Sequence, residues 1–284
     1  VLSFLQPARG GLFVDATVGL GGHAAALLDG GAARVLGLDR DPQALALAAE
    51  RLAGFGDRVR LVHADYRDVE DVLAREGVTE VAGVLADLGV SSMQLDTPAR
   101  GFSFRADGPL DMRMDPTRGP TAADVLATTP ERELADLIYT FGEERFSRRI
   151  ARAIVAAREA APLQTTSQLA AIVRRAVPHR GYQRIDPATR TFQALRIHVN
   201  RELDRLDAFL AAALGRCAAL ARLVVISFHS LEDRIVKHAF RALEQQGPVP
   251  CRVLTRKPVA PGDAECADNP RARSARLRAI ERLA

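Results

Sequence analysis

Tryptophan is absent from this 284-residue chain, and tyrosine and cysteine each occur only three times. The cysteines, Cys217, Cys251 and Cys266, are widely spaced and lack the close pairing of metal ligands, so we expect reduced thiols and no metal site. No apolar run approaches the roughly 20 residues that cross a bilayer. The first residues also lack the basic start and apolar core of a signal peptide. These absences predict a cytoplasmic protein without a membrane partner.

Acidic residues are scarce in one segment of the chain. Residues 145–201 hold 12 Arg and 2 acids, a balance of +10, whereas residues 1–144 hold 13 Arg and 23 acids, a balance of −10. Such a block is typical of a surface that binds a polyanion. Arg148, Arg149 and Arg152 lie off the apolar stripe of a predicted helix in this block, and we expect them to bind RNA. The alternative is a solvated, arginine-rich helical face.

A glycine turn follows the first apolar run of the chain. That run ends in Asp15, and Gly19, Gly21 and Gly22 then precede an alanine-leucine stretch typical of a helix; a second apolar run ends in Asp39. Glycines let the backbone approach a ligand closely, and a helix N-terminus offers free N–H groups. The second acid can accept hydrogen bonds from two ribose hydroxyls. The unit predicts a nucleoside-containing cofactor and leaves open whether it is a methyl donor or a dinucleotide.

Strand and helix patterns alternate over residues 11–90. We predict strands at 12–16, 34–39, 59–63 and 82–87, with helices between them at 22–29, 42–53 and 67–76. This alternation predicts an α/β fold with a doubly wound, mostly parallel sheet. Ligands of such sheets bind at the carboxyl ends of the strands. Four acids fall at or just beyond such ends: Asp15, Asp39, Asp65 and Asp87.

The alternation stops near residue 91, and the pattern becomes irregular and then helical. Helices are predicted over residues 121–177, and one long helix over 191–214. A strand at 222–228, a helix at 231–243 and a possible final strand at 275–283 follow. We therefore expect an α/β domain built from residues 1–115 and 195–284. A helical, arginine-rich insertion at 116–194 is expected to recognise the substrate.

Longer strings narrow the prediction. Four of them are Asp15-Ala-Thr-Val-Gly-Leu-Gly-Gly-His23, Asp87-Leu-Gly-Val-Ser-Ser-Met-Gln-Leu-Asp96, Gly108-Pro-Leu-Asp-Met-Arg-Met-Asp-Pro116 and Ile226-Ser-Phe-His-Ser-Leu-Glu-Asp-Arg234. With them the chain resembles, over nearly its whole length, the bacterial 16S rRNA (cytidine N4)-methyltransferases of the RsmH or MraW family. The resemblance implies a class I, Rossmann-like methyltransferase fold that uses S-adenosylmethionine. It also implies methylation of the exocyclic N4 of a cytidine in the decoding centre of 16S rRNA, with the small ribosomal subunit as partner.

The same resemblance implies which residues bind the donor. Gly21, Gly22 and His23 would line its methionine side, and Asp39 would hold the ribose hydroxyls. Tyr66 would pack on the adenine, which favours a flat apolar face. A simpler interpretation is that His23 is a turn residue whose backbone, and not its side chain, contributes to the site.

Four residues are expected nearer the reacting atoms. By resemblance, Asp87 and Gln94 would complete the pocket, and Asp15 would supply a carboxylate for the cationic donor. Asp87 is also the candidate catalytic residue, because a carboxylate and a backbone carbonyl can orient the N4 amine for attack on the methyl group. His229 is the candidate general base. Its alternative role is structural, as a partner of the acids that follow it.

Two other functions fit some of these residues. Gly19-x-Gly21-x-x-Ala24 also permits a nicotinamide-dependent oxidoreductase. An RNA-binding ribosome assembly factor with a vestigial nucleoside pocket is the alternative that is not an enzyme. The acids at positions 15, 39 and 87 argue against it, since a vestigial site should lose them.

Overall fold

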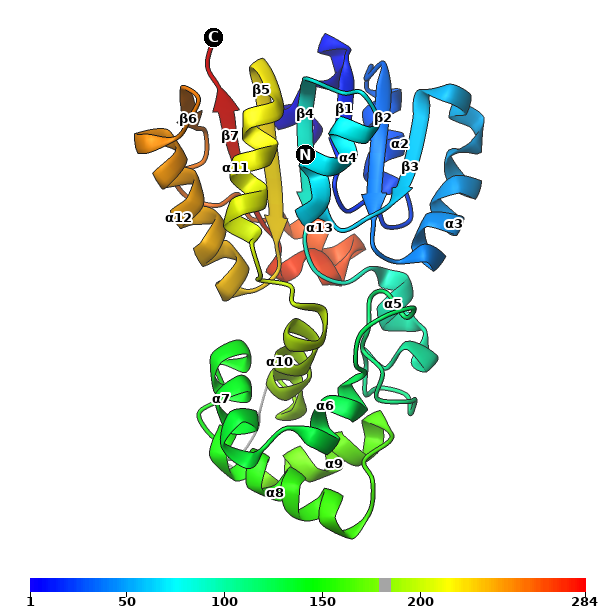
Figure 1. The fold of residues 1–284 in the computed structure, drawn as a ribbon, viewed down its shortest axis with the longest axis vertical. Coiled ribbons are helices and arrows are strands. Elements are labelled where there is room, and N and C mark those ends of the chain that lie inside the picture. The colour runs from blue at the N-terminus through cyan, green and yellow to red at the C-terminus, as the bar shows by residue number, and fades with distance from the viewer. Residues whose placement is uncertain (179–184) are drawn as a thin grey trace. The chain divides into compact units, whose positions relative to one another are not determined.

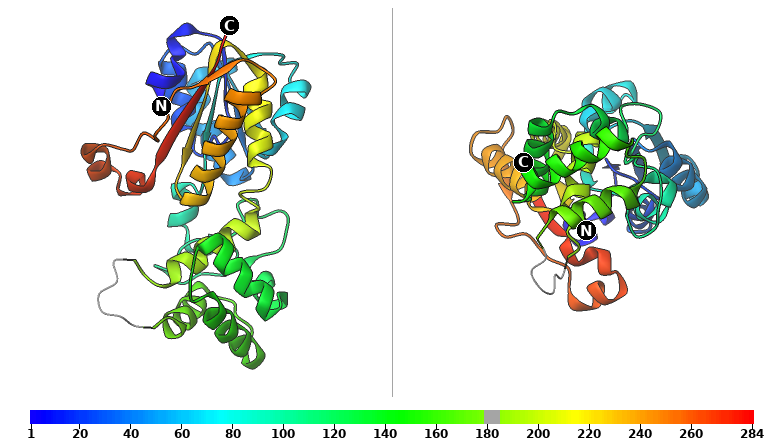
Figure 2. Two further views of the ribbon diagram at one scale, coloured as in Figure 1. Left: turned by 90° about the vertical axis from the view of Figure 1, so that its left-hand side faces the viewer. Right: turned by 90° about the horizontal axis from the view of Figure 1, so that it is seen from below.

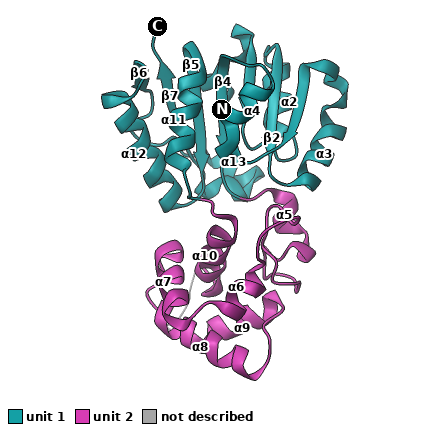
Figure 3. Ribbon diagram, viewed as in Figure 1, with its two compact units in different colours: residues 1–89, 203–284 teal, residues 90–202 magenta. Residues whose placement is uncertain are grey.

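The computed structural model describes residues 1–178 and 185–284, which form two compact units (Figure 3). Unit 1 comprises residues 1–89 and 203–284, and unit 2 comprises residues 90–202. Unit 2 therefore extends beyond the predicted insertion of 116–194 at both ends. The physical reason is apolar packing, because Leu110, Met112 and Leu195 are buried in the core of unit 2.

Unit 1 is built on one seven-stranded sheet with the order β3-β2-β1-β4-β5-β7-β6 (Figure 1). Its strands are β1 (Leu12–Asp15), β2 (Arg34–Asp39), β3 (Val59–His63), β4 (Val81–Asp87), β5 (Cys217–Ser227), β6 (Cys251–Val253) and β7 (Arg276–Arg282). Strands β1 to β5 pair in parallel, and β7 runs antiparallel to both of its neighbours. The predicted doubly wound, mostly parallel sheet and the predicted tail strand are confirmed.

Helices cover both faces of this sheet. The unit contains α1 (Leu2–Leu5), α2 (Gly22–Asp29), α3 (Pro42–Leu52), α4 (Val69–Arg75), α11 (Leu206–Arg216), α12 (Ser230–Gln246) and α13 (Asp263–Asp268). Successive strand residues point to opposite faces: Phe13 packs in the core with α2 and α3, and Val14 packs in the core with α4, α11 and α12. Figure 2 shows that the segment with α13 stands off from the sheet.

Unit 2 is helical, as predicted for residues 121–177. Its helices are α5 (Ser92–Asp96), α6 (Ala122–Thr128), α7 (Glu131–Gly142), α8 (Ser147–Ala160), α9 (Thr166–Ala176) and α10 (Ala188–Asn200). A capping box begins α9, because the Thr165 hydroxyl accepts from the Gln168 N–H and the Gln168 side chain accepts from Thr165 N–H. Among the described residues, no helix is both long and apolar enough to cross a membrane.

The predicted long helix over 191–214 is wrong. The chain leaves α10 at Arg201 (φ 50°), passes Arg205 (φ 55°) and only then enters α11. The apolar stripe does not reveal the break, because both halves keep helical spacing while they enter different cores. Phe192 is buried in unit 2, whereas Leu210 is buried in unit 1.

Candidate functional site

Three predicted acids lie at one edge of the sheet of unit 1. Asp15, Asp39 and Asp87 are the last residues of β1, β2 and β4, which are adjacent and parallel. The turn that follows β1 is hydrogen-bonded to the ends of both β2 and β4. The Thr17 hydroxyl accepts a 2.7 Å hydrogen bond from the Asp87 N–H, and the Gly19 N–H donates to Asp39 Oδ2 over 2.8 Å. The structure therefore brings these acids together around one glycine turn.

Asp15 is completely buried, with no exposed surface. Its Oδ1 accepts from the Thr17 N–H at 3.3 Å, and its Oδ2 finds no hydrogen-bond partner within residues 1–178 and 185–284. Burial raises the pKa of Asp15 to about 7, and nearby His23 only partly opposes that rise.

His23 contacts Asp87 through its side chain. His23 Nε2 lies 3.3 Å from Asp87 Oδ2, with the two side chains 35% and 29% exposed. This hydrogen bond is the main cause that raises the pKa of His23, with a further contribution from the negative charge of Asp15. Asp87 Oδ1 is buried and finds no partner in the described part of the chain. Sequence reasoning missed this contact, because it joins the first turn of α2 to the end of β4 and leaves no local pattern.

Asp39 keeps hydrogen-bonding capacity despite two backbone donors. Its Oδ2 accepts from Gly19 and its Oδ1 accepts from the Asp41 N–H, each over 2.8 Å. Burial raises the pKa of Asp39, and these two N–H groups limit the rise. Each oxygen of an ionised carboxylate offers about two acceptor sites, so one site per oxygen is left for a diol.

The conformation of the turn requires glycine at position 21 but not at position 22. Gly21 precedes α2 with φ 80°, and a Cβ atom there would lie 2.9 Å from Leu52 Cδ1. Gly22 begins the helix, and a Cβ atom there would meet only Arg51, at 3.7 Å. The close approach of α3 thus restricts position 21 to glycine and leaves more room at position 22.

Tyr66 lies in the core of unit 1. Its side chain is 8% exposed, and its ring centroid is 4.9 Å from that of Phe209, with the planes tilted by 57°. Asp65 precedes it and binds Arg67 through both carboxylate oxygens, at 2.8 Å each. Burial opposes ionisation of Asp65, yet Arg67 and Arg40 hold its pKa below the usual range. Contact between Tyr66 and adenine stays a prediction.

Gln94 and His229 both make helix caps. Gln94 is buried in unit 2, where its side chain accepts from the Ser91 N–H at 3.0 Å in a capping box. His229 caps α12, with Nδ1 accepting from the Glu232 N–H at 3.4 Å. His229 Nε2 lies 3.2 Å from Glu232 Oε1. These contacts give His229 the structural role that was its alternative interpretation. Donor binding by Gln94 and general-base catalysis by His229 stay predictions.

The three predicted RNA-binding arginines are exposed on α8. Arg148, Arg149 and Arg152 lie opposite the buried Ile150 and Ile154. Of the three, Arg152 makes an ion pair, 3.7 Å to Glu131, and both partners are open to solvent. Such a pair is weak and leaves the arginine available.

Other arginines of the basic block have structural roles. Arg158 donates to the carbonyls of Leu126 and Thr129 at the end of α6. Arg196 binds Glu202 through two nitrogens, at 2.8 and 2.9 Å. The positive balance of residues 145–201 therefore overstates the charge that is free to meet a polyanion.

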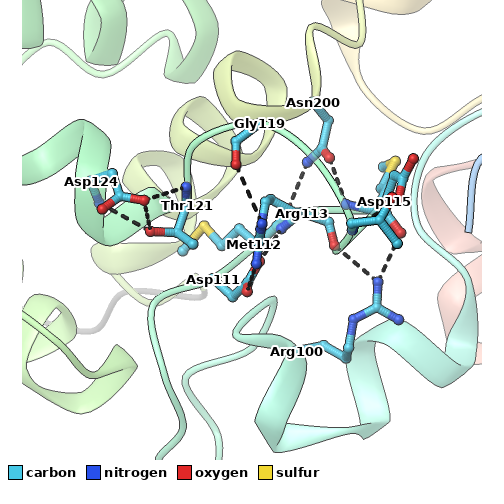
Figure 4. A network of polar contacts seen from close by, with 11 residues as sticks. Arg100, Asp111, Met112, Arg113, Asp115, Gly119, Thr121, Asp124 and Asn200 are labelled. Atoms are coloured by element: carbon cyan, nitrogen blue, oxygen red, sulfur yellow. Dashed lines mark hydrogen bonds and ion pairs between the residues drawn. The ribbon is translucent and has the colours of Figure 1, made fainter.

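The irregular segment of unit 2 is fixed by buried side chains (Figure 4). Asn200 accepts from the Met114 N–H at 2.7 Å and donates to the Met112 carbonyl at 2.7 Å. Arg100 donates to the carbonyls of Arg113 and Met114, both at 2.9 Å. The two side chains satisfy a backbone that includes Met112 at φ 62°, a conformation that costs energy in a residue other than glycine. Sequence reasoning missed Asn200, which is 86 positions from Met114.

Aromatic residues of this segment pack inward. The Phe104 ring centroid lies 4.7 Å from that of Phe192, and Phe102 is 7% exposed. None of the three strand-end acids lines the surface cavity of about 580 Å³, whose lining residues are Leu2, Ser3, Gln6, Pro7, Ala8, Arg9 and Gly30.

Comparisons with known proteins agree on one family. The model of the MraW methylase family matches residues 1–283. The ribosomal RNA small subunit methyltransferase H of Sorangium cellulosum is 56% identical over 283 residues, covering 100% of this chain and 88% of that protein. The protein of the same name from Oleidesulfovibrio alaskensis is 52% identical, with coverages of 100% and 93%.

Solved structures are more distant. A putative methyltransferase from Streptococcus mutans in complex with SAH is 12% identical with a TM-score of 0.45, covering 99% of this chain and 96% of that one. An rRNA methylase from Streptococcus thermophilus is 13% identical with a TM-score of 0.44, covering 100% and 95%.

Proposed function

Since the chain belongs to the MraW methylase family, whose methyl donor is S-adenosylmethionine, we propose that it methylates the exocyclic N4 of a cytidine in 16S rRNA. The target is a decoding-centre cytidine within the small ribosomal subunit. The observation that carries the proposal is a pair of buried carboxylate oxygens beside the glycine turn, on Asp15 and Asp87, for which the described residues offer no hydrogen-bond partner.

The residues at this edge fit the donor. Uncompensated buried carboxylates are costly, so the site favours a ligand that brings positive charge. S-adenosylmethionine has a sulfonium and an α-ammonium group, and its ribose diol suits the free acceptor sites of Asp39. Gly21, Gly22 and His23 form the start of α2, where the methionine part would bind.

Asp87 is proposed to orient the acceptor. The N4 amine of cytosine is a poor nucleophile, because its lone pair is delocalised into the ring. When bound, the donor supplies an electrophilic methyl carbon on a positively charged sulfur. A hydrogen bond from the amine to the carboxylate of Asp87, whose side chain is 29% exposed, would aim the nitrogen at that carbon. The nitrogen forms the new bond to carbon, the carbon–sulfur electrons return to sulfur, and one amine proton is released.

The acceptor base must leave its stack to reach this edge. Arg148, Arg149 and Arg152 are proposed to hold the surrounding phosphates. A general base is not required, because the proton can leave after methyl transfer. If a general base acts, His229 is the candidate. Its contacts with Glu232, however, support a structural role as a helix cap.

The direct test is methyl transfer from labelled donor to small-subunit particles that lack the modification. Nucleoside analysis should recover the label as N4-methylcytidine at one site. Label on another base, or on the ring carbon of cytosine, would refute the proposed position of methylation, although the protein would still be a methyltransferase. Free 16S rRNA assayed in parallel identifies the required state of the substrate.

The nicotinamide alternative has its own test. The protein is heated with S-adenosylhomocysteine and, separately, with NAD. A ligand that binds only the folded state raises the melting temperature. We expect a rise with S-adenosylhomocysteine alone, and a rise with NAD alone would contradict the assigned donor.

A further inference from the structure

The carboxylate of Asp15 is completely buried, and the surrounding hydrogen bonds and charges compensate only part of the cost of that burial. It has no exposed surface, and its Oδ2 has no hydrogen-bond partner in the described ranges. A carboxylate in such a place is expected to take up a proton unless a positive charge lies nearby. In agreement, its pKa is raised to about 7, where a small change in local charge changes its ionisation.

The surrounding charges only partly meet this need. His23 on α2 is the nearby cation, and its ring is already bound to Asp87 on β4. The carboxylates of Asp87 and of Asp39 on β2 both disfavour ionisation of Asp15. Asp15 is therefore the acid of this group whose charge depends most on what occupies the site.

We propose that Asp15 lets the site distinguish the methyl donor from its demethylated product by charge. It is ionised when the cationic donor is bound, and it is protonated when the neutral-sulfur product is bound. The inference rests on the proposed donor, and it adds a discriminating residue that acts without touching the transferred methyl group.

The charge balance is simple. S-adenosylmethionine carries one positive charge more than S-adenosylhomocysteine, and both carry the same ammonium and carboxylate groups. Donor binding therefore releases a proton from Asp15. Methyl transfer removes the sulfonium charge and frees one proton from N4, and Asp15 takes up one proton. In a buried site this charge difference weighs much more than it would in water.

Affinity against pH tests the proposal. Donor and S-adenosylhomocysteine are titrated separately by calorimetry at pH 6, 7 and 8. Complete coupling to one group that titrates near pH 7 strengthens donor binding about tenfold between pH 6 and pH 8. Product affinity should fall over the same pH range, because the product binds the protonated form of Asp15, so the preference for the donor should grow with pH. Loss of the proton from His23 acts in the same direction, since His23 is then neutral.

Two variants separate Asp15 from the other groups. Asp15→Asn keeps the shape and removes the charge, so it should flatten most of the pH dependence and reduce the preference for the donor. Glu281→Gln is the matched control: Glu281 lies on β7 and is 4% exposed, and its carboxylate is 2.8 Å from Nε of Arg222 on the neighbouring strand β5. It should keep the wild-type pH profile. A preference that does not change with pH in the wild type, or an unchanged slope in Asp15→Asn, overturns the proposal.

Proton release gives a measurement that needs no variant. Calorimetry at pH 7 in two buffers with different ionisation heats should show proton release on donor binding and proton uptake on product binding. Equal proton release for both ligands overturns the inference about Asp15 but does not contradict the proposed methyltransferase function. Absence of binding by either ligand refutes the proposed donor as well.

Discussion

At the end of β2, Asp39 binds the glycine turn and the start of α3 at once, through Gly19 and Asp41. Asp39→Ala should weaken S-adenosylmethionine binding by about tenfold or more, because hydrogen bonds to a charged group contribute about 1.5–3 kcal/mol each. It should also lower the melting temperature, since two backbone donors lose their acceptor. Calorimetry measures the affinity. Asp39→Asn should fall between the wild type and the alanine variant, and a folded Asp39→Ala with normal affinity would contradict the ribose assignment.

Asp87, at the same edge of the sheet, is proposed to act on the other reactant, the acceptor base. Asp87→Ala should lower the turnover of rRNA methylation more than it lowers donor affinity, because Asp87 is proposed to hold the acceptor amine. Asp87→Asn keeps an acceptor oxygen and should be milder. Single-turnover methylation, with donor affinity measured on the same samples, separates the two effects. Near-normal turnover in Asp87→Ala would exclude the orienting role.

Among the elements, those with a local cause were predictable. Thr165 and Gln168 form a capping box within four positions, and Asp41 with Pro42 begins α3 as expected. Strands β1 to β5 follow from their apolar runs, whereas the short strand β6 was not predicted. The acids at the strand ends were predictable too, because parallel strands end at one edge of the sheet.

Features that depend on distant parts of the chain were not predictable. The break between α10 and α11 arises because two cores bury the two halves of one stripe. The contact of His23 with Asp87 joins residues 64 positions apart. The Asn200 contacts also cross a long stretch of sequence. None of these leaves a periodic pattern in the sequence.

The segment held by Asn200 permits a stability test. Asn200→Ala removes the partners of the Met112 carbonyl and the Met114 N–H, both inside unit 2. A buried polar group without a partner costs about 1–3 kcal/mol, so we expect a loss of roughly 2–5 kcal/mol in unit 2. Amide hydrogen exchange over residues 100–119 measures it.

Asn269→Ala is the matched control for that test. Asn269 is exposed and accepts from the Arg271 N–H at 3.2 Å, so its loss should cost less than about 1 kcal/mol. If both alanine variants exchange like the wild type, Asn200 does not hold the segment in place.

Across the whole molecule, charge is unevenly distributed between the units. Reversal of Arg148, Arg149 and Arg152 to Glu should weaken RNA binding and leave donor binding intact, because the acids proposed to bind the donor, at the ends of β1, β2 and β4, belong to unit 1. The dependence of RNA affinity on salt should become shallower by roughly one unit per lost phosphate contact. Filter binding over a range of salt concentrations measures both quantities.

The control for that experiment reverses three exposed arginines of unit 1, Arg34, Arg60 and Arg75. The change in total charge is the same, so a purely global effect would weaken RNA binding equally in both variants. A triple variant on α8 with wild-type affinity and an unchanged salt slope would identify that face as solvated surface.

The insertion of unit 2 between β4 and β5 affects how the chain is made. These strands are neighbours in the sheet, yet residues 90–202 are synthesised between them. Until β5 emerges from the ribosome, β4 has an unpaired edge, although its Val84 and Leu85 are completely buried in the finished protein. Open edges of this kind pair readily with other chains, and parallel sheets form slowly. Residues 1–89 of unit 1 are synthesised before unit 2, but unit 1 cannot be completed until unit 2 has been synthesised. The nascent chain is therefore most exposed to aggregation while unit 2 is being made.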